Sequence, residues 1–258
     1  MDLLRAELRK VILFFLVVFL TWQVLYIVNW VLNGIDWLLA YSVVLVVITC
    51  FFILDRQRMD DLGLKMPPFW RRCVLIGFAF AGFVILIWLD ISLILLPITV
   101  HEIFNRGFLS IPYNVLFAFV VGFVEETSFR GYILGKLRKV CSDTKAIIYS
   151  AILFGLYHVS IVLILLSATP APNPFTYWSS YVLFTFVVGL FLGYFCVNSG
   201  GTIIGTITHH SSHILLSSLI PYELAASFTI GHLVSTIAYI IVLLLLMLVK
   251  LKGWLTSS

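Results

Sequence analysis

Three charged side chains, Glu125, Glu126 and Arg130, lie within a stretch that is otherwise apolar. At the centre of a bilayer each such charge costs about 2.5–3.5 kcal/mol on insertion scales. If residues 113–139 form one α-helix, Glu126 and Arg130 share a face, with the acid N-terminal to the base, which is the favourable order for an ion pair. Glu125 points about 100° away around the helix. We therefore expect Glu126 and Arg130 to form a structural pair and Glu125 to be available for chemistry.

Histidines in two other apolar stretches can complete a site with Glu125. His158 lies about halfway along one of them, and His209 and His213 lie one helical turn apart in the other. Together, these four residues resemble the ligand set of a hydrolytic zinc site. They also suit a metal-free site in which Glu125 is the general base on a water that His158 orients. In that site His209 and His213 would stabilise the oxyanion.

Other polar residues at membrane depth have simpler interpretations. His210 is rotated off the face that its neighbours share, and we interpret it, like His232, as a partner in helix–helix hydrogen bonding. Asp90 is interpreted as a structural partner of another polar group. Acids and histidines inside a membrane are also typical of a proton or cation path. The spacing alone therefore leaves a hydrolase and a transporter equally open.

The composition predicts the environment in which these residues act. The chain has 258 residues, of which 62% are hydrophobic and only 11% are charged. A soluble protein of this composition would expose large apolar patches, so we expect a polytopic integral membrane protein. No polar stretch is long enough for a separate soluble domain, which predicts a single membrane domain over residues 1–258. The four cysteines are scattered and indicate neither disulfides nor a zinc knuckle.

The hydropathy predicts an all-α fold with about eight transmembrane helices around a polar intramembrane cavity. The expected spans are residues 11–32, 37–54, 73–98, 113–135, 146–168, 177–197, 202–219 and 228–249. If the spans alternate in direction, all but two of the 16 Lys and Arg residues fall on one side of the membrane. The exceptions are Arg106 on the far side and Arg130 within the membrane. This asymmetry predicts that both termini are cytoplasmic.

Three motifs on three predicted spans resemble those of the CPBP intramembrane proteases. They are Glu125-Glu126-x-x-x-Arg130, Phe154-x-x-x-His158 and His209-x-x-x-His213. The family is named for CAAX proteases and bacteriocin-processing enzymes, and it includes the eukaryotic CAAX endopeptidase of the Rce1 type, also called Abi. The resemblance covers about residues 60–258. Each motif alone is a weak signal, but three in the same order are a strong one.

The resemblance implies an all-helical fold whose conical cavity opens toward the membrane and the cytoplasm. By similarity, Glu125 activates water with the help of His158, while His209 and His213 line the other side of the scissile carbonyl. Members of the family are commonly labelled metalloproteases. Zn²⁺ or another divalent metal, held by these same four residues, is therefore a further expectation.

The last position of the third motif departs from the family pattern. The family usually has asparagine there, whereas this chain has His213. Asparagine suits a donor to an oxyanion, and histidine can either donate a hydrogen bond or bind a metal. The substitution favours a metal site and also fits an inactive scaffold. The resemblance further implies that Glu126 and Arg130 hold the site together.

The expected function is that of an intramembrane endopeptidase acting on a CAAX-like tail or a small peptide precursor. Its expected partners are membrane lipid and a peptide or lipidated protein substrate, with no nucleic acid. The size and the lack of an appended domain favour a bacterial plasma membrane, with the endoplasmic reticulum as the eukaryotic alternative. Two other functions stay open, namely a non-catalytic bacteriocin-immunity or scaffold protein of the same fold and a proton- or cation-coupled transporter.

Overall fold

Helices form the regular secondary structure of this protein. The computed structural model describes residues 2–31, 36–95, 111–165, 174–218 and 225–249. The elements in chain order are α1 (Asp2–Val31), α2 (Trp37–Leu54), α3 (Trp70–Leu95), α5 (Ile111–Glu126), η2 (Thr127–Ile133), α6 (Leu134–Leu137), α7 (Asp143–Leu165), α8 (Pro174–Asn198), α9 (Ile204–Ser217) and α10 (Ala225–Val249). No strand occurs in the described ranges, so the predicted all-α class is confirmed.

Four helices within the described ranges are long and apolar enough to cross a membrane. Their apolar stretches are Leu4–Asn29, Trp37–Leu54, Trp70–Ile87 and Ser179–Asn198. A shorter one, His232–Met247, lies in α10. Large apolar side chains are exposed along these helices, as a lipid environment requires. The protein is an integral membrane protein, and the full number of eight transmembrane helices stays a prediction.

The segment that carries the glutamates is one continuous helix with an unusual middle. α5, η2 and α6 follow one another without a break, and η2 is a π-helix. The assumption of one α-helix over residues 113–139 therefore fails at Thr127–Ile133, which is π-helical. A π-helix closes its hydrogen bonds between residues five apart, and such turns occur frequently at functional sites.

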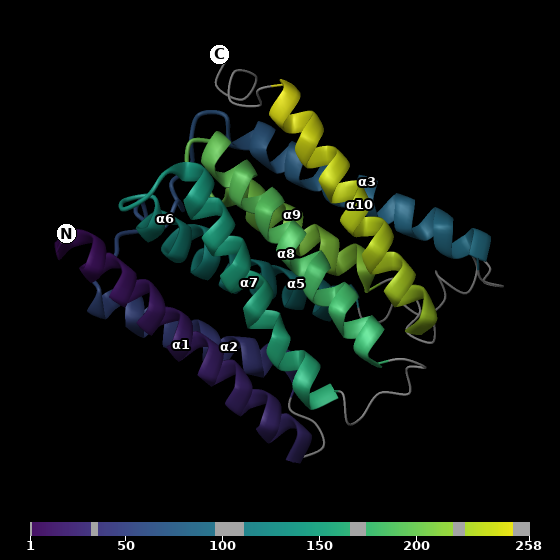
Figure 1. Cartoon of the computed structure of the whole chain (residues 1–258), viewed down its shortest axis with the longest axis horizontal. Coiled ribbons are helices and arrows are strands. Elements are labelled where there is room, and N and C mark those ends of the chain that lie inside the picture. The colour runs from purple at the N-terminus through teal and green to yellow at the C-terminus, as the bar shows by residue number, and fades with distance from the viewer. Residues whose placement is uncertain (1, 32–35, 96–110, 166–173, 219–224, 250–258) are drawn as a thin grey trace.

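The arrangement of the helices places the site between two flanking pairs. α1 and α2 lie together on one side of the molecule, and α3 and α10 lie together on the opposite side (Figure 1). The helices α5, α7, α8 and α9 lie between these pairs (Figure 1). The short helix α9 packs against both α3 and α5, while α8 packs against α7 and α10. The histidines of α9 therefore lie inside the bundle.

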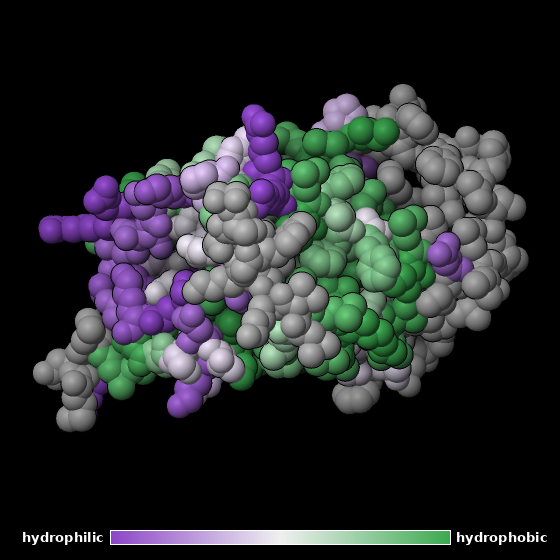
Figure 2. Space-filling view, turned by 90° about the horizontal axis from the view of Figure 1, so that it is seen from above, coloured by the Kyte–Doolittle hydropathy of each residue, from purple (hydrophilic) through white to green (hydrophobic). Residues whose placement is uncertain are grey.

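Polar side chains gather at one end of the molecule's long axis, beside a broad apolar band (Figure 2). This pattern is typical of a helix bundle with its apolar band in lipid and one end in water. Arg106, the predicted exception on the far side, lies outside the described residues.

Candidate active site

The predicted ion pair between Glu126 and Arg130 is present. Arg130 Nη1 donates to Glu126 Oε1 at 2.9 Å, and both side chains are fully buried. The Arg130 guanidinium also lies over the Phe154 ring of α7, with 4.2 Å between Cζ and the ring centroid. A buried pair offsets its desolvation only with good geometry and further contacts, and this pair has both. It fixes η2 against α7.

Glu125 is buried, at 3% exposure, among side chains from three other helices. Tyr41 of α2 donates its hydroxyl proton to Glu125 Oε1 at 2.8 Å. The other oxygen, Oε2, lies 3.9 Å from His158 Nε2 of α7 and 3.6 Å from His210 Nε2 of α9. These separations are too long for direct hydrogen bonds. Among the described residues, Glu125 Oε2 has no hydrogen-bond partner.

His158 is oriented by its own helix. Its Nδ1 lies 2.8 Å from the Phe154 carbonyl oxygen. A carbonyl only accepts, so Nδ1 carries the proton, and in the neutral ring Nε2 keeps a lone pair. That lone pair faces the Glu125 carboxylate. The structure therefore brings Glu125 and His158 together, as the sequence predicted.

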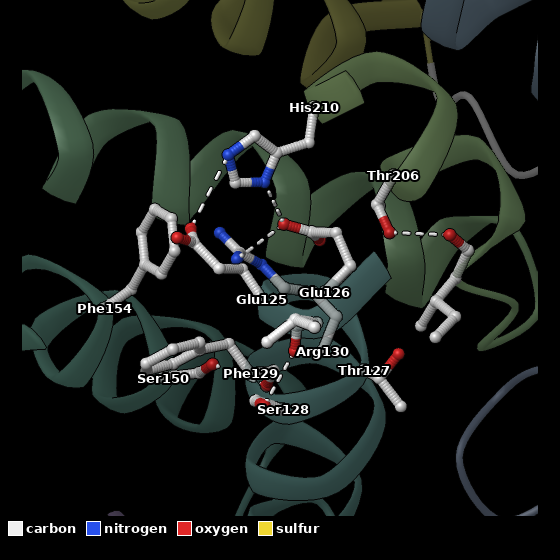
Figure 3. Close-up of polar contacts among 12 residues, drawn as sticks. Glu125, Glu126, Thr127, Ser128, Phe129, Arg130, Ser150, Phe154, Thr206 and His210 are labelled. Atoms are coloured by element: carbon white, nitrogen blue, oxygen red, sulfur yellow. Dashed lines mark hydrogen bonds and ion pairs between the residues drawn. The ribbon is translucent and has the colours of Figure 1, made fainter. Parts of the chain in front are cut away.

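His210 lies between the two glutamates, and its contact with α5 confirms its interpretation as a partner in helix–helix hydrogen bonding (Figure 3). Its Nδ1 donates to Glu126 Oε1 at 2.8 Å, while Nε2 faces Glu125. His210 reaches Glu126 because it lies on the side of α9 that packs against α5. A Cβ on Gly122 would lie 2.3 Å from Ser211 Oγ, so the backbones come close there. Gly122, one turn before Glu126, is the sequence signal that could have indicated this face.

His209 and His213 lie in a different cluster, with Tyr239 of α10. His209 Nδ1 donates to the Gly77 carbonyl of α3 at 3.1 Å, and Nε2 accepts from the Tyr239 hydroxyl at 2.6 Å. His213 Nδ1 lies 3.5 Å from the same hydroxyl oxygen. Within the described ranges, no hydrogen bond or ion pair joins either histidine to a glutamate. Because His209 and His210 point about 100° apart, only one can face α5.

The predicted metal site of Glu125, His158, His209 and His213 does not fit this arrangement. Both ring nitrogens of His209 already have hydrogen-bond partners, which leaves no lone pair for a metal. Over the described part of the chain, no three His, Cys, Asp or Glu side chains form a group that could hold a metal ion. Among the residues that the structure describes, the four predicted ligands therefore do not form a metal-binding set, and a bound Zn²⁺ or other divalent ion stays a prediction.

Two further polar residues singled out in the sequence, His232 and Asp90, lie on α10 and α3. His232 of α10 lies 3.5 Å from Ser180 of α8, measured from Nδ1 to Oγ, which agrees with its interpretation as a helix–helix partner. Asp90 is exposed on α3. A polar partner for Asp90 stays a prediction.

Fold and site together define a helical membrane protein with a buried site of acids and imidazoles. Residues 107–216 match the family model Rce1-like, described as type II CAAX prenyl endopeptidase Rce1-like. The matched segment contains both glutamates, Arg130 and the histidines of α7 and α9. The resemblance to the CPBP intramembrane proteases is therefore confirmed over this segment. No curated protein matches the chain.

Proposed function

We propose that this protein is an intramembrane endopeptidase of the CAAX-protease type, which hydrolyses a peptide bond with water activated by Glu125. One observation carries the proposal. The buried Glu125 carboxylate has one oxygen held by Tyr41 and the other facing two imidazole nitrogens. This geometry lies in a chain that matches a protease family over residues 107–216.

The two oxygens of Glu125 have different tasks in this mechanism. Tyr41 donates to Oε1 and so fixes the plane of the carboxylate. Oε2 then takes a proton from a water that also contacts His158 Nε2, and the hydroxide formed attacks the scissile carbonyl carbon. The same carboxyl group can return this proton to the leaving amine. Positioned proton transfer of this kind contributes typically about 10²–10⁴-fold to the rate.

We assign the stabilisation of the oxyanion to His210 in place of His209 and His213. In its protonated form His210 donates through Nδ1 to Glu126 and presents Nε2–H to the space beside Glu125. Glu126 is in turn held by Arg130. These two residues therefore hold the His210 ring in position before the reaction begins. Removing one oxyanion donor costs about 10²–10³-fold in kcat in well-studied enzymes.

The proposed substrate is a CAAX-like C-terminal tail or a small peptide precursor, presented at the membrane by a peptide or lipidated protein. In this proposal water reaches the site from the polar end of the molecule, the end at which hydrophilic side chains gather in Figure 2. We propose that this end and both termini face the cytoplasm, because Lys and Arg concentrate on the cytoplasmic side of membrane proteins. A bacterial plasma membrane is the proposed location.

Glu125→Gln tests the proposal. The amide keeps the shape of the side chain and its contact with Tyr41 but cannot take a proton. We expect cleavage of membrane-anchored peptides in proteoliposomes, followed by mass spectrometry, to fall by about 10²–10⁴-fold. Asp90→Asn makes the same kind of change at an exposed position and should cleave normally. Cleavage by Glu125→Gln at the wild-type rate would overturn the mechanism and favour a non-catalytic scaffold.

A further inference from the structure

The last turn of α2 carries large apolar side chains on its outer surface. Ile53 is 69% exposed, Leu54 is 82% exposed, and Met59 in the loop that follows α2 is 69% exposed. Leu54 ends an apolar stretch that is long enough to cross a membrane. The next residue, Asp55, pairs with Lys136 of α6, at the end of the molecule where hydrophilic side chains gather (Figure 1, Figure 2). The apolar side chains therefore lie near the boundary between the acyl chains and the headgroups of a bilayer.

Two arginines, Arg56 and Arg58, follow this turn, and both are exposed. Within the described ranges, neither guanidinium has a hydrogen-bond or ion-pair partner. The adjacent acid does not neutralise Arg56, because Asp55 pairs with Lys10 and Lys136, each at 2.8 Å. Both guanidinium groups are therefore able to bind an anion outside the chain.

The backbone at Arg56 is in the left-handed conformation, with a φ of 53°. Its N–H donates to the Ile53 carbonyl at 3.1 Å, and the Gln57 N–H donates to the Phe52 carbonyl at 2.8 Å. This is the Schellman ending of a helix, whose left-handed residue is usually glycine because a side chain there costs free energy. The other described residues with a positive φ are all glycines, namely Gly63, Gly200 and Gly201. Arginine at this position therefore places a cation beside the apolar end of α2 in spite of that cost.

The start of α3, at the other end of the loop, repeats this pattern. The Arg71 guanidinium lies over the Trp70 ring, with 5.6 Å between Cζ and the ring centroid, and Leu75 one turn later is 68% exposed. Tryptophan is enriched where a membrane meets water. The loop and this turn have two further exposed cations and two exposed acids, namely Lys65, Arg72, Asp60 and Asp61. Exposed cations therefore outnumber exposed acids over residues 56–72.

We propose that the end of α2 binds an anionic phospholipid. Arg56 and Arg58 contact the phosphate, while the apolar side chains of the last turn contact the acyl chains. Each Lys or Arg near an anionic membrane surface strengthens binding by about fivefold. An acidic protein would complement the two arginines but would leave the apolar side chains uncovered. The proposal does not rest on the peptidase function, because binding is measured without turnover.

The test uses the purified full chain in an uncharged detergent at constant ionic strength. The probes are phosphatidylglycerol and phosphatidylcholine with the same short acyl chains, glycerol phosphate without acyl chains, and a polyglutamate peptide. A ligand that binds only the folded protein raises the unfolding midpoint in a saturable way. We expect phosphatidylglycerol to raise it most, because it alone has both a net negative headgroup and acyl chains. An equal rise with any of the other three probes, or no saturable rise with phosphatidylglycerol, would overturn the proposal.

Arg56→Gly separates a role in binding from a role in the fold. Without lipid this variant should unfold at a higher temperature than the wild type, because glycine suits the left-handed conformation. Its apparent Kd for phosphatidylglycerol, from the titration of the unfolding midpoint, should nevertheless rise about fivefold. Arg56→Lys keeps the charge and should bind like the wild type.

Arg58→Gln tests the second cation and should raise the apparent Kd by a similar factor. Lys145→Gln, at an exposed position in the first turn of α7, makes the matched change elsewhere and should leave the Kd unaltered. Wild-type Kd values for both Arg56→Gly and Arg58→Gln would place the lipid elsewhere and overturn the proposal.

Discussion

Tyr41 gives Glu125 a fixed orientation from a helix that lies outside the matched segment 107–216. The contact is fully buried, and its donor and acceptor are 84 residues apart in the chain. A carboxylate that is free to rotate would present either oxygen to the histidines. With Oε1 held by the tyrosine, only Oε2 faces His158 and His210. We therefore regard Tyr41 as a positioning residue for the proposed base.

Tyr41→Phe should lower kcat by about 10- to 150-fold, because hydrogen bonds to charged groups contribute about 1.5–3 kcal/mol. KM should change little, since Tyr41 acts through Glu125. The assay is peptide cleavage in proteoliposomes at several substrate concentrations. Tyr113→Phe removes a similar hydroxyl, which donates to Asp36 at the surface, and serves as the control. Equal kcat values for the two variants would mean that Tyr41 has no positioning role.

Which of these contacts the sequence could predict depends on how far apart the partners lie in the chain. The pair of Glu126 and Arg130 follows from a spacing of four residues, and the structure confirms it. The contact from Tyr41 depends on how α2 packs against α5, which no local pattern indicates. The choice between His209 and His210 depends on which side of α9 meets α5. A helix can present either residue equally well until its neighbour is known.

The helices themselves were largely predictable because apolar runs of sufficient length leave few alternatives in a membrane. α2, for example, begins and ends where the hydropathy predicts, at Trp37 and Leu54. The π-helix η2 was not predictable, because its residues are as apolar as those of a regular helix. Its position follows from packing, since Gly131 in η2 lies against the backbone of the loop that follows α2.

Gly131→Ala should destabilise the protein by about 1–3 kcal/mol, which is the usual cost of overpacking. The new methyl group would lie 2.8 Å from the Leu62 carbonyl oxygen, a backbone atom that cannot move alone. Gly135→Ala is the matched control four residues later, because its nearest contact is 3.6 Å. That change should be neutral or stabilising, since alanine is favoured over glycine in helices by about 1 kcal/mol. The measurement is thermal unfolding in detergent, and equal effects would contradict the close approach.

A network of charges joins α6 to α1 and to the end of α2, the first two helices of the chain. Lys136 of α6 is only 4% exposed and lies 2.8 Å from Asp55 and 3.3 Å from Glu7, measured from Nζ to carboxylate oxygens. Asp55, at the end of α2, also accepts from Tyr132 at 2.9 Å and pairs with Lys10 of α1 at 2.8 Å. α1 and α2 lie outside the matched segment. This network and the Tyr41 contact therefore link α1 and α2 to the helix that carries the site.

The network predicts how the stability of the whole molecule depends on pH. Burial by itself raises the pKa of Asp55, but hydrogen bonds from Lys10, Lys136 and Tyr132 outweigh it, so the pKa lies below its ordinary value of 3.8. Because the folded pKa is below the unfolded one, the ionised carboxylate stabilises the fold above about pH 4. That contribution is lost as the pH falls through the folded pKa.

Asp55→Asn should therefore lower the unfolding midpoint at neutral pH. As the pH is lowered, the midpoint of this variant should also fall less steeply than that of the wild type. The comparison is a thermal unfolding series in detergent from about pH 6 to about pH 3, where the wild type loses the Asp55 contribution and the variant has none to lose. Asp60→Asn, in the exposed part of the following loop, is the control and should follow the wild-type curve. Parallel curves for wild type and Asp55→Asn would show that α1, α2 and α6 are held together by apolar packing, with little contribution from these charges.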